Sequence, residues 1–487
     1  MTGDKPEHLE GARTPSLLDA LIPVGTLLVL LGLSYYLFRD TASYGPNQIA
    51  LLFCGLVAMA VAYKNGMAVE GIRQAVIDGV SSGLVAIMIL LGVGALIGTW
   101  AMSGTISTMV YYGLKLLSPH YFYATTALIC AAVGFSIGSS WTVAGTIGIG
   151  MMGIAESMSL SPAITAGAVI SGAYFGDKAS PLSDTANLAT AAAGSSLFDH
   201  IRESFWTSVP SLLLAVIFFS LLGAPGDFNA IATLNSLHQH ATISLWAFLP
   251  LLVVVGLALL RFPPFVTIFI GALAGGVLAV VLAPSSVIAL ADNAALTPAL
   301  AQLKGVWSAL ATGYHVTSGD PMVDKLLTRG GMASMLNTVW LIITALAFGA
   351  VVEHAGLLQR LMDPLIQKAR SIGAMVASVV ATCIGTNILA SDQYIAIVLP
   401  ARLFRKAFID RGYSPVLLSR VVGDSGTVTS PLIPWNSCGA YMAAALGIST
   451  LAFAPYCFFN LLNPLITIIF SALGFRVLCA DKLQTAA

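Results

Sequence analysis

The chain has 487 residues, of which 57% are hydrophobic and only 9% are charged, and its formal net charge is zero. Soluble domains carry roughly 25% charged residues, so this composition excludes an ordinary soluble protein and predicts a polytopic membrane protein. The balanced charge gives no reason to expect a nucleic-acid partner. Six cysteines without CxxC spacing indicate neither a disulfide framework nor a metal site, and no cofactor is expected.

Apolar stretches recur along the chain after a polar N-terminal tail. Residues 1–16 mix acids and bases, unlike the basic leader of a cleaved signal peptide. A membrane-spanning helix needs about 20 apolar residues. Residues 64–81 have helically spaced apolar residues beside charged ones, which predicts an amphipathic interfacial helix, with a counterpart expected at 300–330. The apolar stretches are 17–38, 46–63, 82–102, 122–153, 161–175, 205–223, 243–260, 263–283, 333–355, 371–400, 414–445 and 448–475.

Two apolar segments, 122–153 and 371–400, are too long for simple spans. Each would be ~45 Å long as one helix, whereas the hydrocarbon core is ~30 Å thick. Small polar residues interrupt each segment near its middle, at 134–140 and at 385–387. The pattern fits either a tilted, broken span or a helical hairpin that enters and leaves the membrane on one side.

Residues 176–187 read Gly-Asp-Lys-Ala-Ser-Pro-Leu-Ser-Asp-Thr-Ala-Asn and lie between apolar stretches. Pro181 removes a backbone donor, so a helix through this segment is expected to break. Non-helical backbone at membrane depth is tolerated only where it is buried in protein or lines a cavity, and an ionisable residue at that depth indicates a functional site. The alternative is an aqueous loop between two spans.

Both features recur in the second half of the chain. Ile-Gly-Ser-Ser at 137–140 resembles Ile-Gly-Thr-Asn at 384–387, and Gly-Asp followed by Ser-Pro-Leu at 176–182 resembles the same motifs at 423–432. The two pairs share an offset of 247 residues, and the second copy has three additional residues before Ser-Pro-Leu. This common order and offset predict an internal repeat and favour a membrane break over a loop at 176–187.

Basic residues predict opposite orientations for the two copies. Both flanks of 371–400 are rich in Lys and Arg, which marks cytoplasmic loops and favours a hairpin. The flanks of 122–153 contain only Lys115 and are expected outside. Opposed halves of this kind are typical of inverted-repeat carriers. Lys304, Lys325 and Arg329 fall in an expected external loop and fit this scheme poorly.

We therefore predict an all-α polytopic membrane protein with ten crossings, two hairpins and both termini in the cytoplasm. Its two inverted-topology repeats each contain about five transmembrane helices, a re-entrant hairpin and a broken helix. The expected divisions are a cytoplasmic tail at 1–16, repeat 1 at 17–224, an external linker at 225–242, repeat 2 at 243–476 and a cytoplasmic tail at 477–487.

Polar side chains gather at the two hairpin tips and the two broken helices, which inverted-repeat carriers bring together near the midplane. Hydroxyl, amide and carboxylate oxygens suit a hard cation such as Na⁺, and burial disfavours the charged form of a carboxylate, which can then hold a proton. The predicted cation- and proton-binding residues are Asp177, Asp184, Asn187, Asn387, Asp392, Asp424, Thr427, Ser430 and Asn436. The predicted substrate or charge partners are Lys178, Ser139, Ser140 and Thr386.

The acidic candidates have structural alternatives. Asp177 and Lys178 can form a structural ion pair. Asp184 can cap the helix that leads to Asn187, and Asp392 can lie near the cytoplasmic face and serve only solubility.

Other titratable groups give weaker signals. Interfacial placement is the simpler interpretation of Glu353 and His354, and the other histidines, which include His200, are expected in solvated loops. The sequence shows no spacing typical of a zinc site, a phosphate loop or a Ser/His/Asp triad, so an enzyme is not expected. An ion channel is disfavoured because paired broken helices suit an occluded site better than an open pore.

Three stretches resemble the NhaC family of Na⁺/H⁺ antiporters. The first is 176–187, quoted above. The second reads Asn-Ile-Leu-Ala-Ser-Asp-Gln-Tyr at 387–394 and continues to Leu-Pro-Ala-Arg at 399–402. The third reads Ser-Gly-Thr-Val-Thr-Ser-Pro-Leu-Ile-Pro-Trp-Asn at 425–436 and continues to Cys-Gly-Ala-Tyr at 438–441. Together they cover both halves of the membrane domain.

The resemblance implies a secondary transporter of the bacterial inner membrane with an ion-transporter architecture of hairpins and broken helices. The leading hypothesis is exchange of Na⁺ for H⁺ by alternating access. The alternative is a Na⁺- or H⁺-coupled carrier of a small organic anion or an amino acid, as in malate/lactate exchange or methionine transport. Lys178 would then bind the substrate carboxylate, unless Asp177 or Asp184 neutralises it. A homodimer is expected by analogy with related architectures.

Overall fold

Helices form almost all of the described chain, apart from an isolated β-bridge between Tyr314 and Arg329. The computed structural model describes residues 13–478 except 224–229, 294, 317–320 and 369–370. Parts of both predicted tails and of the predicted linker at 225–242 therefore lie outside the described residues. The predicted domain boundaries stay a prediction.

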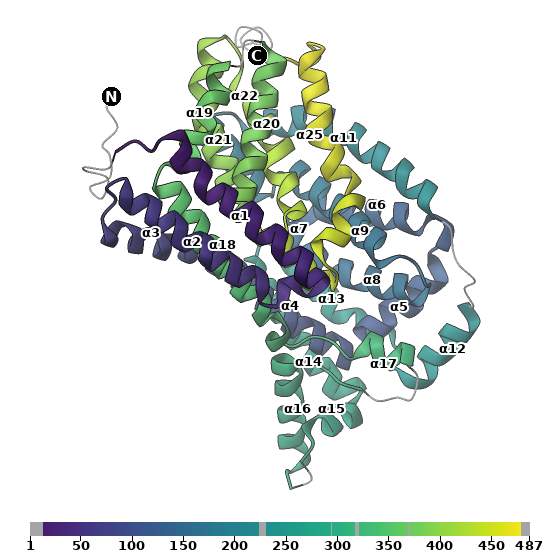
Figure 1. Ribbon diagram of the computed structural model, residues 1–487. Helices are drawn as coiled ribbons and strands as arrows, with labels where there is room; N and C mark the ends of the chain where they lie inside the picture. The colour runs from purple at the N-terminus through teal and green to yellow at the C-terminus, as the bar shows by residue number, and fades with distance from the viewer. Residues whose placement is uncertain (1–12, 224–229, 294, 317–320, 369–370, 479–487) are drawn as a thin grey trace.

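The first half of the chain runs from α1 to α11 (Figure 1). Its helices are α1 (Leu17–Phe38), α2 (Pro46–Lys64), α3 (Val69–Ser82), α4 (Leu84–Met102), α5 (Thr105–Leu116), α6 (Phe122–Ile137), α7 (Ser140–Val143), α8 (Ile149–Ser157), α9 (Pro162–Ala179), α10 (Asp184–Ala193) and α11 (Leu197–Leu222). A π-helical turn at Ala144–Gly148 joins α7 to α8.

The second half runs from α12 to α25. Its helices are α12 (Ala230–His240), α13 (Leu249–Leu259), α14 (Pro264–Leu282), α15 (Pro284–Ala291), α16 (Pro298–Thr312), α17 (Pro321–Leu327), α18 (Leu336–His354), α19 (Leu357–Lys368), α20 (Ile372–Leu389), α21 (Gln393–Asp410), α22 (Pro415–Val422), α23 (Ser437–Leu446), α24 (Thr450–Phe453) and α25 (Phe458–Ala472). A π-helical turn at Gly423–Thr427 follows α22.

Eight helical segments of the described chain are long and apolar enough to cross a membrane, which confirms a polytopic membrane protein. A bent pair, Ser437–Leu446 with Thr450–Tyr456, turns by 88° and brings the number to nine if it counts as one span. Length and composition alone therefore do not reach the predicted ten crossings, because several apolar stretches are divided into shorter helices. The eight segments are Leu17–Phe38, Pro46–Lys64, Val69–Met102, Pro119–Ile137, Leu197–Leu222, Pro264–Leu282, Met332–His354 and Ile372–Leu389.

The predicted amphipathic helix at 64–81 corresponds to α3. Ile72 and Ala75 on this helix are buried, whereas Glu70 and Arg73 are exposed and form an ion pair one turn apart. The buried residues pack against α18 from the second half of the chain. The counterpart expected at 300–330 is also largely helical, as α16 and α17.

Two of the basic residues that fit the charge scheme poorly have an acidic partner. Lys325 lies 2.6 Å from a carboxylate oxygen of Glu156 at the end of α8. Arg329 pairs with the other oxygen of the same carboxylate. Their charge is thus offset within the protein, which weakens their value as markers of sidedness.

The segment 122–157 enters and leaves on one side of the helical bundle. The chain turns at Gly138, whose φ of +74° lies in the left-handed region that favours glycine. The tyrosine hydroxyl of Tyr123, at the start of α6, accepts a hydrogen bond of 2.9 Å from the backbone amide of Ser161, just beyond α8. Both ends of the segment therefore lie together, as in a re-entrant hairpin with its tip at 138–140.

The second long segment is also a hairpin, but its turn lies later than predicted. The sequence placed the interruption at 385–387, whereas α20 continues through these residues to Leu389. The turn lies at 390–392, where Ser391 has a φ of +60° and Asp392 caps α21. At the open end, the Arg411 guanidinium lies 3.3 Å from the Met375 sulfur. The start of α20 and the end of α21 thus lie close together, and both helices are found in the same part of the molecule (Figure 1).

Both predicted broken helices are present. α9 ends at Ala179 and α10 begins at Asp184, so the first break spans 180–183. The second includes the π-helical turn after α22, a short 3-10 turn at Ser430–Leu432 and an extended approach to α23. These local breaks occur where the repeat motifs predict them.

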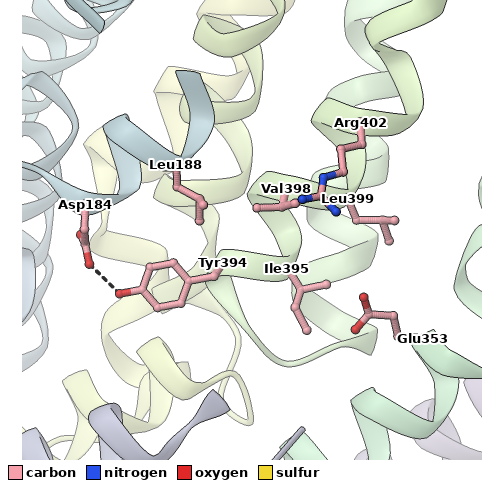
Figure 2. A pocket seen from close by; sticks show the side chains of 8 residues that line it. All are labelled: Asp184, Leu188, Glu353, Tyr394, Ile395, Val398, Leu399 and Arg402. Atoms are coloured by element: carbon pink, nitrogen blue, oxygen red, sulfur yellow. Dashed lines mark hydrogen bonds between the residues drawn. The ribbon is translucent and has the colours of Figure 1, made fainter. Parts of the chain in front are cut away.

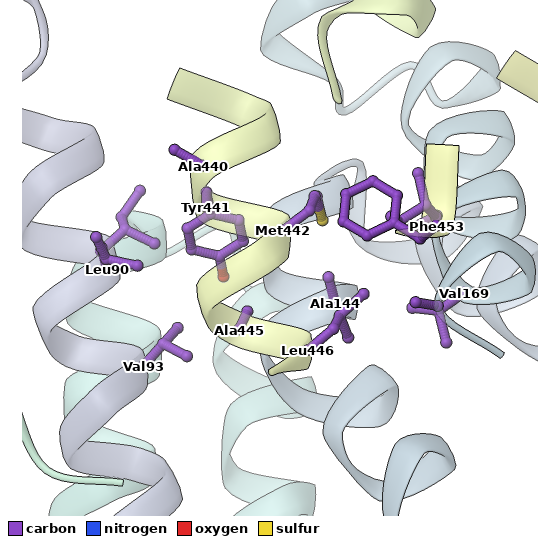
Figure 3. Close-up of a cluster of buried hydrophobic side chains, with 14 of the residues drawn as sticks. Leu90, Val93, Ala144, Val169, Ala440, Tyr441, Met442, Ala445, Leu446 and Phe453 are labelled. Carbon is purple, nitrogen blue, oxygen red and sulfur yellow. The ribbon is translucent and has the colours of Figure 1, made fainter. Parts of the chain in front are cut away.

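Each repeat also contacts the other. The rings of Trp141 in α7 and Tyr441 in α23 stack with centroids 4.0 Å apart, and the Tyr441 hydroxyl donates a 2.8 Å hydrogen bond to the Trp141 carbonyl. Figure 3 shows Tyr441 within an apolar cluster that includes Val93 of α4 and Leu446 of α23. The first hairpin thus rests on the broken helix of the second half. The inverted orientation of the two halves stays a prediction.

Candidate ion-binding site

Asp177 lies in the last turn of α9 and is 3% exposed. One carboxylate oxygen accepts hydrogen bonds from the Ser140 backbone amide at 3.2 Å and from its hydroxyl at 2.7 Å. The other oxygen accepts from the Ser183 hydroxyl at 2.6 Å and lies 3.4 Å from the Thr185 hydroxyl. Among the residues that the structure describes, this carboxylate has no cationic partner within ion-pair distance.

Local sequence explains this arrangement. Ser183 accepts a hydrogen bond from the Ala186 amide and so caps α10, which places its hydroxyl beside Asp177. Gly138 lets the first hairpin tip approach the break, because a Cβ atom there would lie 2.7 Å from the carbonyl carbon of Leu182. The hairpin tip and the break therefore meet at the carboxylate.

Lys178 points to a different cluster from its neighbour Asp177. Its ammonium is buried and pairs with Asp424 of the second broken helix. It also donates to the Ser208 hydroxyl at 2.7 Å and to the Asn463 side-chain oxygen at 3.0 Å. The alternative of a structural Asp177–Lys178 pair is therefore wrong, and neither Asp177 nor Asp184 neutralises this lysine.

Asp424 occupies the position in the second repeat that Asp177 occupies in the first, but in a different electrostatic environment. Besides Lys178, it accepts a 3.0 Å hydrogen bond from Thr207, and its second oxygen lies 3.9 Å from Arg420 Nε. All these side chains are buried. One carboxylate of the repeat pair is thus held by cations and the other by hydroxyl groups.

The second hairpin tip and the second break are joined by amides. The Asn387 side chain donates to the Gly426 carbonyl at 2.8 Å and to the Thr429 hydroxyl at 3.0 Å. Asn436 donates to the Asn387 side-chain oxygen at 3.1 Å and caps α23. The Ser437 amide adds a 3.0 Å bond to the Ser391 carbonyl. These hydrogen bonds connect the tip of the second hairpin to the second break.

The remaining hydroxyl candidates bond mainly to nearby backbone and to other hydroxyls. Ser430 donates to the Thr427 carbonyl, and Thr386 donates to the Thr382 carbonyl, both at 2.8 Å. Ser139 caps α7 at the first tip. Asp392 caps α21 and is 6% exposed, so the alternative that it serves only solubility is wrong.

Asp184 lies on the open side of the first break. Ser183 rather than Asp184 caps α10, so the capping alternative for Asp184 is wrong. Its carboxylate accepts a 2.7 Å hydrogen bond from the hydroxyl of Tyr394 in α21. Asn187, one turn later, is exposed and donates to the Ser183 carbonyl.

Asp184 and Tyr394 line a pocket of about 470 Å³ between α10, α18 and α21 (Figure 2). Glu353 and Arg402 line its other side, and Leu188, Ile395, Val398 and Leu399 form its apolar wall. Glu353 is therefore a pocket residue, in addition to lying at the end of a span as predicted. Within the described chain, Arg402 and both carboxylates lack an ion-pair partner.

The sequence did not predict a buried charged group around Glu203. Glu203 of α11 lies 3.8 Å from Arg420 and 3.5 Å from Arg476. His200, predicted in a solvated loop, is instead buried in α11 with Nδ1 3.1 Å from the Ser419 hydroxyl. Two sequence patterns could have identified these groups. Polar residues recur at helical spacing after residue 197, and Arg420 lies one turn before Asp424.

Comparisons with known proteins cover both halves of the chain. The pattern of the Na⁺/H⁺ antiporter family matches residues 172–475, and that of the C4-dicarboxylate anaerobic carrier matches residues 6–224. The Na⁺/H⁺ antiporter NhaC of Alkalihalophilus pseudofirmus is 35% identical over 94% of this chain and 96% of its own length. The chain belongs to the Na⁺/H⁺ antiporter family.

Membership of the antiporter family confirms the resemblance to NhaC and makes the chain a transporter rather than an enzyme. Other relatives carry different names. The malate-2H⁺/Na⁺-lactate antiporter of Bacillus subtilis is 31% identical over 96% of each chain. The arginine/ornithine antiporter ArcD of Halobacterium salinarum is 30% identical over 98% of this chain and 96% of its own.

Proposed function

We propose that this antiporter exchanges Na⁺ for H⁺ by alternating access and that Asp177 is the carboxylate that carries either ion. The observation that supports this assignment is the environment of Asp177. Its carboxylate is buried among the hydroxyls of Ser140, Ser183 and Thr185 and, within the described chain, lacks an ion-pair partner.

This environment suits both ions. A hydroxyl can donate to a carboxylate and can also turn its lone pairs toward a cation. Carboxylate and hydroxyl oxygens are the hard ligands that a small alkali cation prefers, by extension from Ca²⁺ and Mg²⁺. A carboxylate without a fixed counter-charge is costly to bury in its charged form, so Na⁺ and H⁺ would compete for it. That competition is the simplest basis for exchange.

Asp424 takes a different role in this proposal. Its pairing with Lys178 and its closeness to Arg420 give this carboxylate fixed cationic partners within the protein, so it does not need Na⁺ as a counter-charge. We assign it to holding Lys178 rather than to binding the transported Na⁺.

The test is Na⁺-driven proton movement in proteoliposomes, measured as internal pH without any organic solute. The wild-type protein is expected to acidify or alkalise the lumen according to the direction of the Na⁺ gradient. Asp177→Asn keeps the shape of the side chain but loses its charge, so exchange should fall to the level of empty vesicles. The matched control is Asp199→Asn, on the exposed first turn of α11. Wild-type exchange in Asp177→Asn would return Asp177 to a structural role.

The second candidate function is coupled transport of an organic solute, and the pocket at Asp184 favours it. Lys178 already donates to three acceptors, which argues against its predicted contact with a substrate carboxylate. Arg402, opposite the carboxylates of Asp184 and Glu353, is the better partner for such a group. If Na⁺ drives proton movement only after malate, lactate or an amino acid is added, this function replaces the first.

Location and assembly complete the proposal. We infer a multi-pass protein of the bacterial inner membrane with both termini in the cytoplasm, from the basic flanks of 371–400. A homodimer is proposed by analogy with related architectures alone. Labelling of a single cysteine at Ser16 from either side of the membrane would test the position of the N-terminus.

A further inference from the structure

The buried face of α11 is polar over much of its length, although the helix is apolar enough to cross a membrane. A helix that packs in a membrane protein normally buries apolar or small residues, and polar residues there mark ion or proton pathways. The buried polar residues recur at intervals of three or four, so they share one face. They are His200, Glu203, Ser204, Thr207, Ser208 and Ser211.

α25 carries a second polar stripe. Asn460, Asn463, Thr467 and Ser471 are each fully buried and also recur every three or four residues along one face. The other face of this helix is apolar and exposed, as at Ile469, which is 52% exposed. Such a helix separates a lipid-facing side from a polar interior side.

The two stripes meet at two levels, and we call the region between them the polar seam. At one level, the Asn463 amide donates to the Ser211 hydroxyl at 3.1 Å. At the other, Arg476, just beyond α25, lies 3.5 Å from Glu203. Figure 1 shows α25 in yellow beside α11 in teal. Lys178 joins the deeper level through Ser208 and Asn463.

Several buried polar atoms at the seam have no hydrogen-bond partner in the described protein. Native structures satisfy almost all such atoms, with ordered water where protein groups do not reach. The separations of 3.8 Å from Arg420 to Glu203 and 3.9 Å from Arg420 to Asp424 exceed a direct hydrogen bond and suit a bridging water. The unpartnered atoms are Glu203 Oε2, Arg420 Nε and Nη2, Asp424 Oδ2, Asn460 Oδ1, Thr467 Oγ1 and Ser471 Oγ.

We propose that the polar seam is a hydrated proton path from the end of the molecule at Arg476 to the Lys178–Asp424 pair, with Glu203 as its outermost proton carrier. A proton from water outside would bind the Glu203 carboxylate and pass through seam water to the unpartnered Oδ2 atom of Asp424, leaving the Glu203 carboxylate ionised again. Lys178, at the inner end, is the residue next to Asp177 in α9. The inference rests on the proposed exchange of Na⁺ for H⁺.

The chemistry of the seam suits protons better than Na⁺. Glu203 lies beside Arg420 of α22 and Arg476 beyond α25, and the inner end carries Lys178 and Asp424. These fixed cations repel any entering cation, and the carboxylates of Glu203 and Asp424 offset that repulsion. A proton moves by transfer along water, hydroxyls and carboxylates, so unlike Na⁺ it needs no open passage of ionic size.

Cysteine labelling tests whether the seam holds water. Thr467→Cys and, as a control on the lipid-facing side of the same helix, Ile469→Cys are made in the full chain and reconstituted in vesicles. A small water-soluble methanethiosulfonate is added, and modification at each position is read from peptide masses, which separates it from the native cysteines. Because the thiolate reacts and forms only in water, Thr467→Cys should react at least about tenfold faster than Ile469→Cys. Equal or slower reaction would overturn the proposal.

Transport tests whether the path carries protons. Glu203→Gln is expected to slow Na⁺-driven proton movement at least about tenfold, because the glutamine amide cannot accept and release a proton as a carboxylate does. Exchange of radioactive Na⁺ for Na⁺ across the same vesicles needs no proton and should stay near the wild-type rate. Equal loss of both activities, or of neither, would overturn the role of Glu203.

A second variant covers the case in which Glu203→Gln fails to fold. Thr467→Val removes a seam hydroxyl without changing charge, and it should slow proton movement more than Na⁺–Na⁺ exchange. Thr26→Val, on the exposed face of α1, is its matched control. The labelling result does not depend on which ion is transported. An unhydrated seam therefore contradicts this inference alone, whereas absence of Na⁺-driven proton movement in the wild-type protein contradicts the proposed exchange.

Discussion

Asp177 and Asp424 occupy equivalent positions of the recurring motif but lie in two different environments. Both are buried near the end of the first part of a broken helix. Hydroxyl groups surround Asp177, whereas Lys178 and Arg420 surround Asp424. The lysine follows the first aspartate in sequence but pairs with the second. Asp177 is therefore the carboxylate without a fixed cationic partner in the described chain, as the proposed exchange requires.

The Lys178–Asp424 pair predicts a specific pattern of stability. Lys178→Met leaves a buried carboxylate without its main partner, which costs about 3–5 kcal/mol. Lys178→Met combined with Asp424→Asn removes both charges and should recover more than half of that loss. Thermal unfolding in detergent measures both effects.

An exposed pair provides the control for this prediction. Arg73 and Glu70 pair on α3, and their side chains are 60% and 71% exposed, so Arg73→Met should leave the stability close to that of the wild type. If the double variant at 178 and 424 is no more stable than Lys178→Met, the pair does not act as a unit.

At the residue scale, sequence identified the polar positions better than their partners. Asp177 and Ser183 belong to one motif and Ser140 to another, and the structure brings all three together. The partner of Lys178 is Asp424, which lies 246 residues away in the sequence. Adjacency in the sequence suggests Asp177 instead, which is not its partner. Glu203 and Arg420 were missed because neither belongs to one of the recurring motifs.

At the scale of helices, α6 and α9 pack unusually closely. Gly172 and Gly176 lie on the α9 face that contacts α6, and a Cβ atom at Gly172 would lie 2.1 Å from the carbonyl oxygen of Ala127. Small residues permit such close contact between helix backbones. Since α6 leads to the hairpin tip and α9 to the break, this contact fixes the two elements that surround Asp177.

Gly172→Ala is therefore expected to destabilise the protein by about 1–3 kcal/mol, because the added methyl group overpacks the interface. It should also lower the apparent affinity for Na⁺, since the tip and the break would separate. Thermal unfolding and the Na⁺ dependence of exchange measure the two effects.

Gly385 is the matched control for Gly172. It lies within α20, and a Cβ atom there would meet nothing within 4 Å. Gly385→Ala should be neutral or stabilise the protein by about 0.4–1 kcal/mol. Equal destabilisation by both substitutions would show that the α6–α9 contact is not the cause.

Gly385 also explains why the second hairpin tip was predicted at the wrong residues. The motif at 384–387 resembles the true tip at 137–140, and glycine there suggests an interruption. In α20, however, Asn387 points its amide to the neighbouring break, so the backbone stays helical until Ser391. Helix ends depend on such tertiary partners, which a repeat motif alone does not specify.

At the scale of the whole molecule, the two repeats are connected at the pocket. The hydrogen bond from Tyr394 to Asp184 joins α21 of the second repeat to α10 of the first (Figure 2). Alternating access moves one part of a carrier against another, so a bond across the repeats can stabilise one of the two states over the other.

Tyr394→Phe removes this bond and keeps the ring. Loss of about 1 kcal/mol corresponds to a roughly fivefold shift between two conformations, and the Na⁺ concentration for half-maximal exchange should shift by up to that factor. Tyr63→Phe, at an exposed position of α2, is the control. Unchanged Na⁺ dependence in Tyr394→Phe would indicate that the bond persists through the transport cycle or is absent in both states.

The global arrangement was only partly predictable. Composition was sufficient for a polytopic membrane protein, and the shared offset of 247 residues located both breaks. The number of crossings was not predictable, because the two breaks divide apolar stretches into helices such as α10, α22 and α23, which are too short to count by length. Sidedness rests on basic residues, and Glu156 offsets two of those that fit poorly.

The contacts between the repeats also constrain how such a chain can change over evolutionary time. Trp141 rests on Tyr441, and Tyr394 bonds to Asp184, so each hairpin is supported by a helix encoded in the other half of the gene. A substitution at one of these positions alters the contact of a residue that lies about 200 to 300 positions away in the sequence. Although the halves resemble each other, neither can drift independently, and inherited changes at these positions are expected in compensating pairs.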